Sequence, residues 1–234
     1  MKLSNVTIGL LKHAASINPG IIIDPGSDIF SMHENKTVRM QATVNEDFPR
    51  QFAIMNLNQF LNVLSLFDDP ELDFKEDHVV ITSDTSSQKV VYYYSDPEVI
   101  KQSNKKLKTE IDYEIEFNLS KEDLGALNKA AATIGVEDIC VYSNKGSSDI
   151  CVAVLNKARQ AGNAFELVVG SDDSLTDKSF KIYFRKNNLK LTSNDFCVKL
   201  STKGISTWIA TDCSIPELLF HIAIEKDSQF DEGE

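Results

Sequence analysis

The chain has 234 residues, of which 42% are hydrophobic and 25% are charged, a composition typical of a folded globular protein. No apolar run approaches the roughly 18 residues of a membrane-spanning helix, and the first residues lack the long apolar core of a signal peptide, so we expect neither. A net charge of −11 argues against a uniformly basic, nucleic-acid-binding surface. The four cysteines match no zinc or redox spacing, which favours reduced thiols in a cytosolic compartment.

The first half of the chain is predicted to contain two helices among short strands. Residues 3–17 (LSNVTIGLLKHAASI) begin with Ser4, a good N-cap, and place Ile8, Leu11 and Ala15 on one apolar face. A second, shorter helix is expected within residues 56–67. β-Rich runs separated by turn residues predict strands at residues 20–24, 28–33, 37–44, 50–55, 71–75, 78–82 and 88–94.

The second half repeats this organisation. Residues 119–133 (LSKEDLGALNKAAAT) align with residues 3–17 without a gap, with six identities in fifteen positions at an offset of 116. Ser120 takes the place of Ser4, and Asp123 stands three residues later, close to a capping box. A weaker match of residues 179–191 to the end of the first half predicts a second short helix, within residues 183–194. Strands are predicted at residues 113–118, 138–143, 149–155, 164–170, 179–184, 197–201, 205–210 and 218–225.

Each repeated helix carries a glycine in its middle, Gly9 in the first copy and Gly125 in the second. A mid-helix glycine costs about 1 kcal/mol relative to alanine. The recurrence of this cost at equivalent positions predicts a close packing contact, with two merely tolerated glycines as the alternative.

These elements indicate an α+β fold made of two repeated domains, each with two helices on antiparallel sheets. We expect a first domain at residues 1–95 and a second at residues 112–226. The stretch between them, residues 96–111, is polar, contains a proline and lacks apolar periodicity, as an interdomain linker does. Residues 227–234 form an acidic tail that we expect to be disordered.

Positive charge is concentrated on the predicted helices of this acidic chain. The four helical segments carry seven bases and two acids, a net charge of +5, whereas the remainder carries 17 bases and 33 acids, a net charge of −16. On the first helix Asn5, Gly9, Lys12 and Ser16 share one face, and on its repeat Lys121, Gly125, Asn128 and Ala132 share the equivalent face. Such faces would attract phosphates without reading bases, although an ordinary solvated face is the alternative.

The opening run MKLSNVTIGLLKHAASINPGI and the pattern L-N-x-F-L-x-x-L-S-L at residues 57–66 resemble the sliding clamps of T-even-type bacteriophages. This resemblance implies two DNA-clamp domains per chain and a homotrimer assembled as a ring, with helices lining the hole. It implies partners in double-stranded DNA, a DNA polymerase and a clamp-loader ATPase, and a place in the cytoplasm of the infected host cell. It implies a processivity factor that tethers the polymerase during DNA replication, with no catalysis, cofactor or metal.

The dimensions of such a ring favour three chains. Four helices per chain and about 10 Å per helix give a lining of roughly 120 Å in a trimer, with roughly 28 Å clear, whereas two chains leave only about 15 Å. A duplex fits the first opening and not the second.

Three groups of site residues follow. The predicted DNA-facing residues are Lys2, Lys12, His13, Lys121, Lys129, Arg185, Lys186 and Lys190. By family analogy the subunit interface pairs Val90, Val91, Tyr92, Tyr93 and Tyr94 of one chain with Phe165, Leu167 and Val169 of the next. A partner peptide is expected at Val99, Ile100, Leu218, Phe220 and Ile222, for which core packing is the alternative.

Two other functions remain open at this stage. The chain contains no P-loop, G-x-S-x-G, H-E-x-x-H or G-x-G-x-x-G motif, and its histidines are scattered, so we predict that it is not an enzyme. A metal-dependent nuclease is the enzyme alternative that the sequence leaves open. The other alternative is a monomeric, clamp-like accessory protein that binds partners without encircling DNA.

Overall fold

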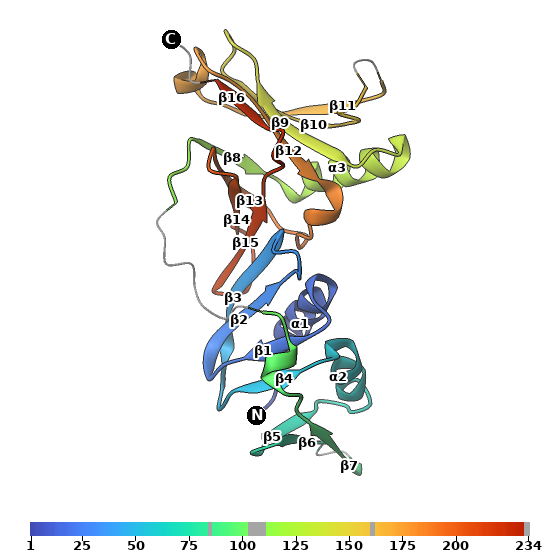
Figure 1. Cartoon of the computed structure of the whole chain (residues 1–234). Coiled ribbons are helices and arrows are strands. Elements are labelled where there is room, and N and C mark those ends of the chain that lie inside the picture. The colour runs from blue at the N-terminus through green and yellow to red at the C-terminus, as the bar shows by residue number, and fades with distance from the viewer. Residues whose placement is uncertain (84–85, 103–110, 160–161, 232–234) are drawn as a thin grey trace. The chain divides into compact units, whose positions relative to one another are not determined.

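The computed structural model describes residues 1–83, 86–102, 111–159 and 162–231 (Figure 1). The chain divides into two compact units. The first comprises Met1–Lys108 and Ser214–Leu218, and the second comprises Thr109–Cys213 and Leu219–Glu234.

The first unit places helices over short antiparallel strands (Figure 1). Helix α1 buries Leu10, Leu11 and Ala14, and it contacts strands β2 and β3 and helix α2. Strands β1 and β4 pair, β2 and β3 pair, and β5, β6 and β7 form a three-stranded sheet with β7 at one edge. The elements are α1 (Asn5–Ile17), β1 (Ile21–Ile23), β2 (Gly26–Met32), β3 (Val38–Phe48), β4 (Phe52–Ile54), α2 (Leu57–Leu64), β5 (Glu71–Phe74), β6 (His78–Ser83), β7 (Ser86–Tyr93) and the 3-10 turn η1 (Pro97–Val99).

The second unit packs helix α3 against strands β10 and β11 through Leu124, Leu127 and Ala131. One sheet has the order β11-β10-β9-β12-β16, and strands β15, β14, β13 and β8 hydrogen-bond in that order. The elements from residue 115 onward are β8 (Ile115–Leu119), α3 (Lys121–Ile134), β9 (Asp138–Ser143), β10 (Asp149–Leu155), β11 (Phe165–Ser171), η2 (Asp173–Leu175), β12 (Ser179–Arg185), η3 (Lys186–Asn188), β13 (Phe196–Ser201), β14 (Ile205–Ala210), β15 (Glu217–Ala223) and β16 (Gln229–Asp231).

The predicted repeat is confirmed at the level of capping chemistry. Helix α1 begins where the Thr7 N–H donates to Ser4 Oγ at 3.2 Å, and α3 begins where the Asp123 N–H donates to Ser120 Oγ at 3.0 Å. Because a serine satisfies an otherwise unpaired N–H at each start, both helices begin at the same point of the repeat. The fifteen predicted strands are likewise confirmed, with small differences at their ends.

The predicted second helix of the second half is wrong. Residues 183–194 complete strand β12 and then form only the 3-10 turn η3, which has no side-chain cap. Its counterpart α2 buries four apolar residues at helical spacing, from Leu57 to Leu64. The later segment offers only Leu189 and Leu191, both half-buried, after two asparagines of low helix propensity. An apolar stripe is what α2 has and η3 lacks.

The prediction of a disordered tail is also wrong for its described part. Gln229–Asp231 form strand β16, which pairs with β12, and the ring of Phe230 stacks on that of Phe180. Backbone pairing and one aromatic residue hold this part of the acidic segment on the sheet. Residues 232–234 lie outside the described residues.

The two helix glycines do not pack against any other described element. Beyond the backbone of its own helix, a Cβ at Gly9 or at Gly125 would meet no described atom within 4 Å, and both positions are exposed. The predicted close packing contact is therefore wrong.

Residues 96–102 of the predicted linker are attached to the first unit. Ile100 is buried beside Gly20, and the side chain of Gln102 donates to the carbonyl of Ile22 at 3.0 Å. Residues 103–110 of the predicted linker lie outside the described residues.

Replacing Gly9 and Gly125 by alanine should stabilise the chain by about 0.5–1 kcal/mol per site, because alanine restricts the unfolded backbone and finds open space in the helix. Urea unfolding at a fixed protein concentration measures the gain. A loss of stability would show that these positions contact something in the folded protein.

Candidate DNA-facing surface and subunit edges

The polar faces predicted for the repeated helices are exposed. On α1 the exposed residues include Asn5, Gly9, Lys12 and Ser16, opposite the buried residues that contact the sheet. On α3 the exposed residues include Lys121, Gly125, Asn128, Lys129 and Ala132. Both helices therefore present small polar residues and lysines, with no large apolar side chain among these positions.

The lysines of these faces differ in how far their charge is already compensated. Lys12 and Lys129 are exposed and Lys186 is half-buried, and among the residues that the structure describes none of the three has a carboxylate within 4 Å. Lys121 lies 3.5 Å from Asp212, an exposed pair of small energetic weight. The three uncompensated lysines are the strongest candidates for phosphate contacts.

The other predicted DNA-facing residues, Lys2, His13, Lys190 and Arg185, all interact with other residues of the chain. Lys2 lies beside strand β5, where Nζ contacts Asp69 Oδ2 at 2.5 Å. His13 and Lys190 are half-buried. Arg185 Nη1 donates to Asp138 Oδ1 at 2.9 Å, and the side chain of Asp138 is only 9% exposed.

Arg185 belongs to a network that holds the second unit together. Asp138 Oδ2 accepts a second hydrogen bond, at 3.1 Å, from the backbone N–H of Lys157. Arg185 Nε lies 3.8 Å from Glu225 Oε2. Because a buried carboxylate requires compensation, the charge of Arg185 serves the fold. Contact of Arg185 with DNA stays a prediction, with its charge already partly compensated within the chain.

The two strands expected at the subunit interface are both sheet edges. Strand β7 is one end of the sheet β5-β6-β7, and β11 is one end of the sheet β11-β10-β9-β12-β16. On β7, Val91 and Tyr93 are exposed, whereas Tyr92 faces inward and its ring packs edge-on against Phe60 at 5.2 Å. Unpaired edges with apolar side chains are suited to pairing with another strand.

The structure differs from the predicted interface residues at the end of β7 and on β11. Tyr94 lies outside β7, its ring packs against Phe52 at 5.7 Å, and burial raises the pKa of its hydroxyl to about 12. It belongs to the core of the first unit and not to the edge. On β11, Phe165, Leu167 and Val169 are half-buried, whereas Val168 is 63% exposed. The sequence missed Val168 because strand alternation alone does not tell which face is open.

The predicted peptide site is wrong for three of its five residues. Leu218, Phe220 and Ile222 are buried, and the ring of Phe220 packs against Phe196 at 6.0 Å. They are core residues, as the alternative of core packing predicted. Ile100 is buried too, so that Val99, at 55% exposed, is the accessible member.

A small pocket of about 250 Å³ borders Val99 in the first unit. Met55, which is 54% exposed, adds a second apolar side chain to it. No sequence pattern distinguishes Met55 from an ordinary strand residue, so only the folded chain identifies it. The lining residues are Asn18, Pro19, Gly20, Glu34, Met55, Val99, Ile100 and Lys101.

Comparison with known proteins identifies the family. A model described as "DNA polymerase processivity factor" matches residues 2–102, and one described as "gp45 sliding clamp, C terminal" matches residues 116–216. The sliding clamp of Vibrio phage KVP40 is 36% identical over 211 residues, which cover 89% of this chain and 94% of that protein. The chain belongs to the bacteriophage sliding clamp family. The sliding clamp of Escherichia phage RB69 is 28% identical over 99% of this chain and 100% of its own length.

Solved structures of clamps from other organisms share the fold. A proliferating cellular nuclear antigen from Entamoeba histolytica matches with a TM-score of 0.68 at 14% identity, over 94% of this chain and 95% of that one. A chain of the PCNA2-PCNA3 complex from Sulfolobus tokodaii matches with a TM-score of 0.65 at 10% identity, over 94% and 96%. The α+β clamp fold with two domains thus persists where sequence similarity has faded.

This sliding clamp is a DNA polymerase processivity factor of phage replication, a protein that works without catalysing a reaction. None of the described helices is long and apolar enough to cross a membrane.

Replacing Arg185 by alanine should destabilise the clamp by about 1–3 kcal/mol, because it leaves the buried carboxylate of Asp138 with only one of its two hydrogen-bond donors. Chemical unfolding measures this loss, and clamp-dependent synthesis measured below the unfolding midpoint should change little. A large loss of synthesis without a loss of stability would instead place Arg185 at the DNA.

Proposed function

We propose that three copies of this chain form a closed ring that encircles duplex DNA, with the exposed faces of α1 and α3 toward the hole. The proposal rests on the repeat: two helices of one chain, α1 and α3, present equivalent, exposed, lysine-bearing faces. A ring built from repeated units directs equivalent faces toward one axis. We propose residues 1–95 and 112–226 as its two clamp domains, connected by residues 96–111.

The lining of the proposed ring would consist of three α-helices and the η3 segment from each chain. The η3 segment stands where the repeat places a second helix, so twelve lining segments of about 10 Å still give an opening of roughly 28 Å. Lysines around this opening attract phosphates through water, and the attraction is weak, screened by salt and independent of base sequence. Contacts of this kind permit sliding.

The acidic remainder of the chain supports the same orientation. The residues outside the predicted helical segments carry a net charge of −16. A net negative charge disfavours DNA, so the lysine-bearing faces of α1 and α3 would offer a duplex a favourable approach. The charge distribution therefore favours DNA inside the ring and not along its outer surface.

The remaining partners follow from the proposed ring. A closed ring needs a clamp-loader ATPase to open it, and it works in the cytoplasm of the infected host cell. The polymerase would dock a short peptide at the pocket beside Val99 and Met55. This pocket offers two exposed apolar side chains for the peptide to contact.

Replacing Lys12, Lys129 and Lys186 together by alanine should weaken retention on circular DNA at least about threefold and flatten its dependence on salt, because nine positive charges leave the proposed hole. Clamp-dependent DNA synthesis at two salt concentrations measures the effect. The matched control replaces Lys36, Lys75 and Lys203, which are exposed and lie outside α1, α3 and η3. Equal losses in the two triple variants would show that only total charge matters.

Either Val91→Pro in β7 or Val168→Glu in β11 should abolish the trimer, because each disrupts one of the two strands proposed to pair between subunits. Native mass spectrometry should show a species of one chain, 26.1 kDa, in place of one about three times heavier. Leu66→Glu, at a position 69% exposed and outside both edges, is the control that keeps the trimer. Intact trimers in both edge variants would show that the subunits do not pair through these strands. A monomeric parent chain would favour the monomeric accessory protein.

A further inference from the structure

The C-terminal segment of the second unit covers an edge of strand β12. The N–H of Glu225 donates to the carbonyl of Tyr183 at 2.9 Å, and the N–H of Tyr183 donates to Ser228 Oγ at 2.9 Å. Farther along, β16 pairs with β12 in a register that joins Ser179 to Asp231. Residues 225–231 therefore occupy hydrogen-bonding positions that would otherwise belong to an open sheet edge.

The hold of β16 on this edge is small. Only three residue pairs form the ladder between β16 and β12, against six between β12 and β9. Phe230 is the single aromatic anchor, half-buried, with its ring stacked 6.2 Å from that of Phe180. A three-residue strand with one anchor can exchange with another peptide without unfolding the sheet beneath it.

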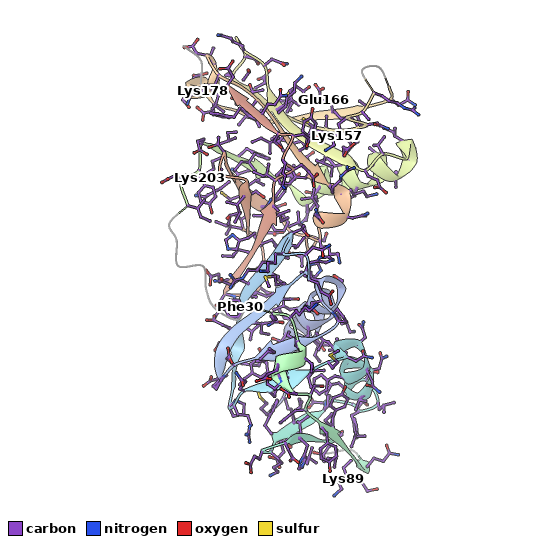
Figure 2. All side chains as sticks on the ribbon, viewed as in Figure 1. Phe30, Lys89, Lys157, Glu166, Lys178 and Lys203 are labelled. Carbon is purple, nitrogen blue, oxygen red and sulfur yellow. The ribbon has the colours of Figure 1, made fainter. Side chains whose placement is uncertain are left out.

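Charge holds the segment that leads into β16. Lys157, labelled in Figure 2, places Nζ 2.8 Å from Asp227 Oδ2 and 3.8 Å from Glu225 Oε2. The side chain of Lys157 is 17% exposed, and its hydrogen bond lowers the pKa of the Asp227 carboxyl. The acidic residues of the segment thus meet a cation supplied by the body of the unit.

Unfilled space lies on both sides of the anchor. A pocket of about 390 Å³ is lined by Ile182, Ser201 and Phe230 among others, and one of about 410 Å³ is lined by Phe180, Phe230 and the bases Lys145 and Lys181. The groove around β16 therefore combines a weakly covered sheet edge, apolar surface and two more positive charges. Residues 225–234 (EKDSQFDEGE), with five acids and one aromatic residue, match these features.

We propose that this edge of β12 is a docking groove for an acidic peptide with one aromatic anchor, carried by a protein that works on the clamp. In the free clamp its own C-terminal segment fills the groove as a self-ligand, which the incoming peptide displaces strand for strand. The chemistry of the self-ligand defines that of the partner: an added strand, an aromatic side chain on Phe180, carboxylates at Lys157, and an acidic residue in the pocket that Lys145 and Lys181 line with Asp231. The groove is distinct from the pocket beside Val99.

Self-occupation lowers the apparent affinity of the groove for any other peptide. A site that is free for a fraction of the time binds with its intrinsic dissociation constant divided by that fraction. A variant with a loosened C-terminal segment should therefore bind peptide more tightly. If the segment serves only to close the sheet, loosening it should expose no peptide-binding site.

The test measures binding of a fluorescein-labelled peptide of residues 225–234 to the full-length clamp by fluorescence anisotropy. Phe230→Ala should bind this peptide at least about tenfold more tightly than the parent clamp, because the self-ligand loses its anchor. Adding Lys181→Glu should remove most of that gain, whereas adding Lys36→Glu, an exposed position in the first unit, should leave it. A peptide with alanine in place of phenylalanine should not bind.

Equal affinity of the parent clamp and Phe230→Ala, or no binding to a folded Phe230→Ala clamp, would overturn the proposal. Asp227→Ala loosens the segment at an exposed side chain and keeps the aromatic anchor, so it tests the same point if Phe230→Ala does not fold. It should bind more tightly than the parent clamp, by a smaller factor. The proposed groove does not depend on the proposed ring. The native mass of each sample shows whether the trimer forms, so failure of one proposal can be distinguished from failure of the other.

Discussion

The one-sided packing of α1 and α3 is the constraint on which the other features depend. Each helix buries an apolar stripe against strands of its own unit, so its opposite face has to be exposed. That face carries lysines and small residues in both copies. The same contact that stabilises each unit therefore also presents positive charge on a rigid support, which is what a protein that holds DNA without reading it requires.

Charge in this clamp serves two purposes that composition cannot separate. Lys12 and Lys129 have no carboxylate nearby among the described residues, whereas Arg185 compensates the buried carboxylate of Asp138 and Lys157 holds the acidic C-terminal segment. All four are bases in an acidic chain. Whether such a residue can attract phosphate depends on whether a carboxylate of the folded chain already compensates its charge.

Sheet edges are the second recurring theme. Strands β7 and β11 end their sheets with apolar side chains exposed, and β12 would do the same without the three residues of β16. An open edge promotes aggregation in a monomeric protein, whereas in a protein that assembles it provides a strand for pairing. In the proposed ring two of the edges join subunits, and the third is kept closed by the chain itself until a partner arrives.

The sequence by itself determined the repeat, the α+β fold, the starts of α1 and α3 and the exposed lysine faces, because serine caps, 3.6-residue periodicity and strand alternation are local signals. Only the tertiary structure decided the outcome at other places. The segment after Arg185 did not become a helix, since helicity there needed an apolar stripe to pack on a sheet. Phe220 lies in the core while Met55 lies at the surface, and Phe230 anchors a tail whose composition suggests disorder. Burial depends on contacts between residues distant in the chain, and no local pattern contains those contacts.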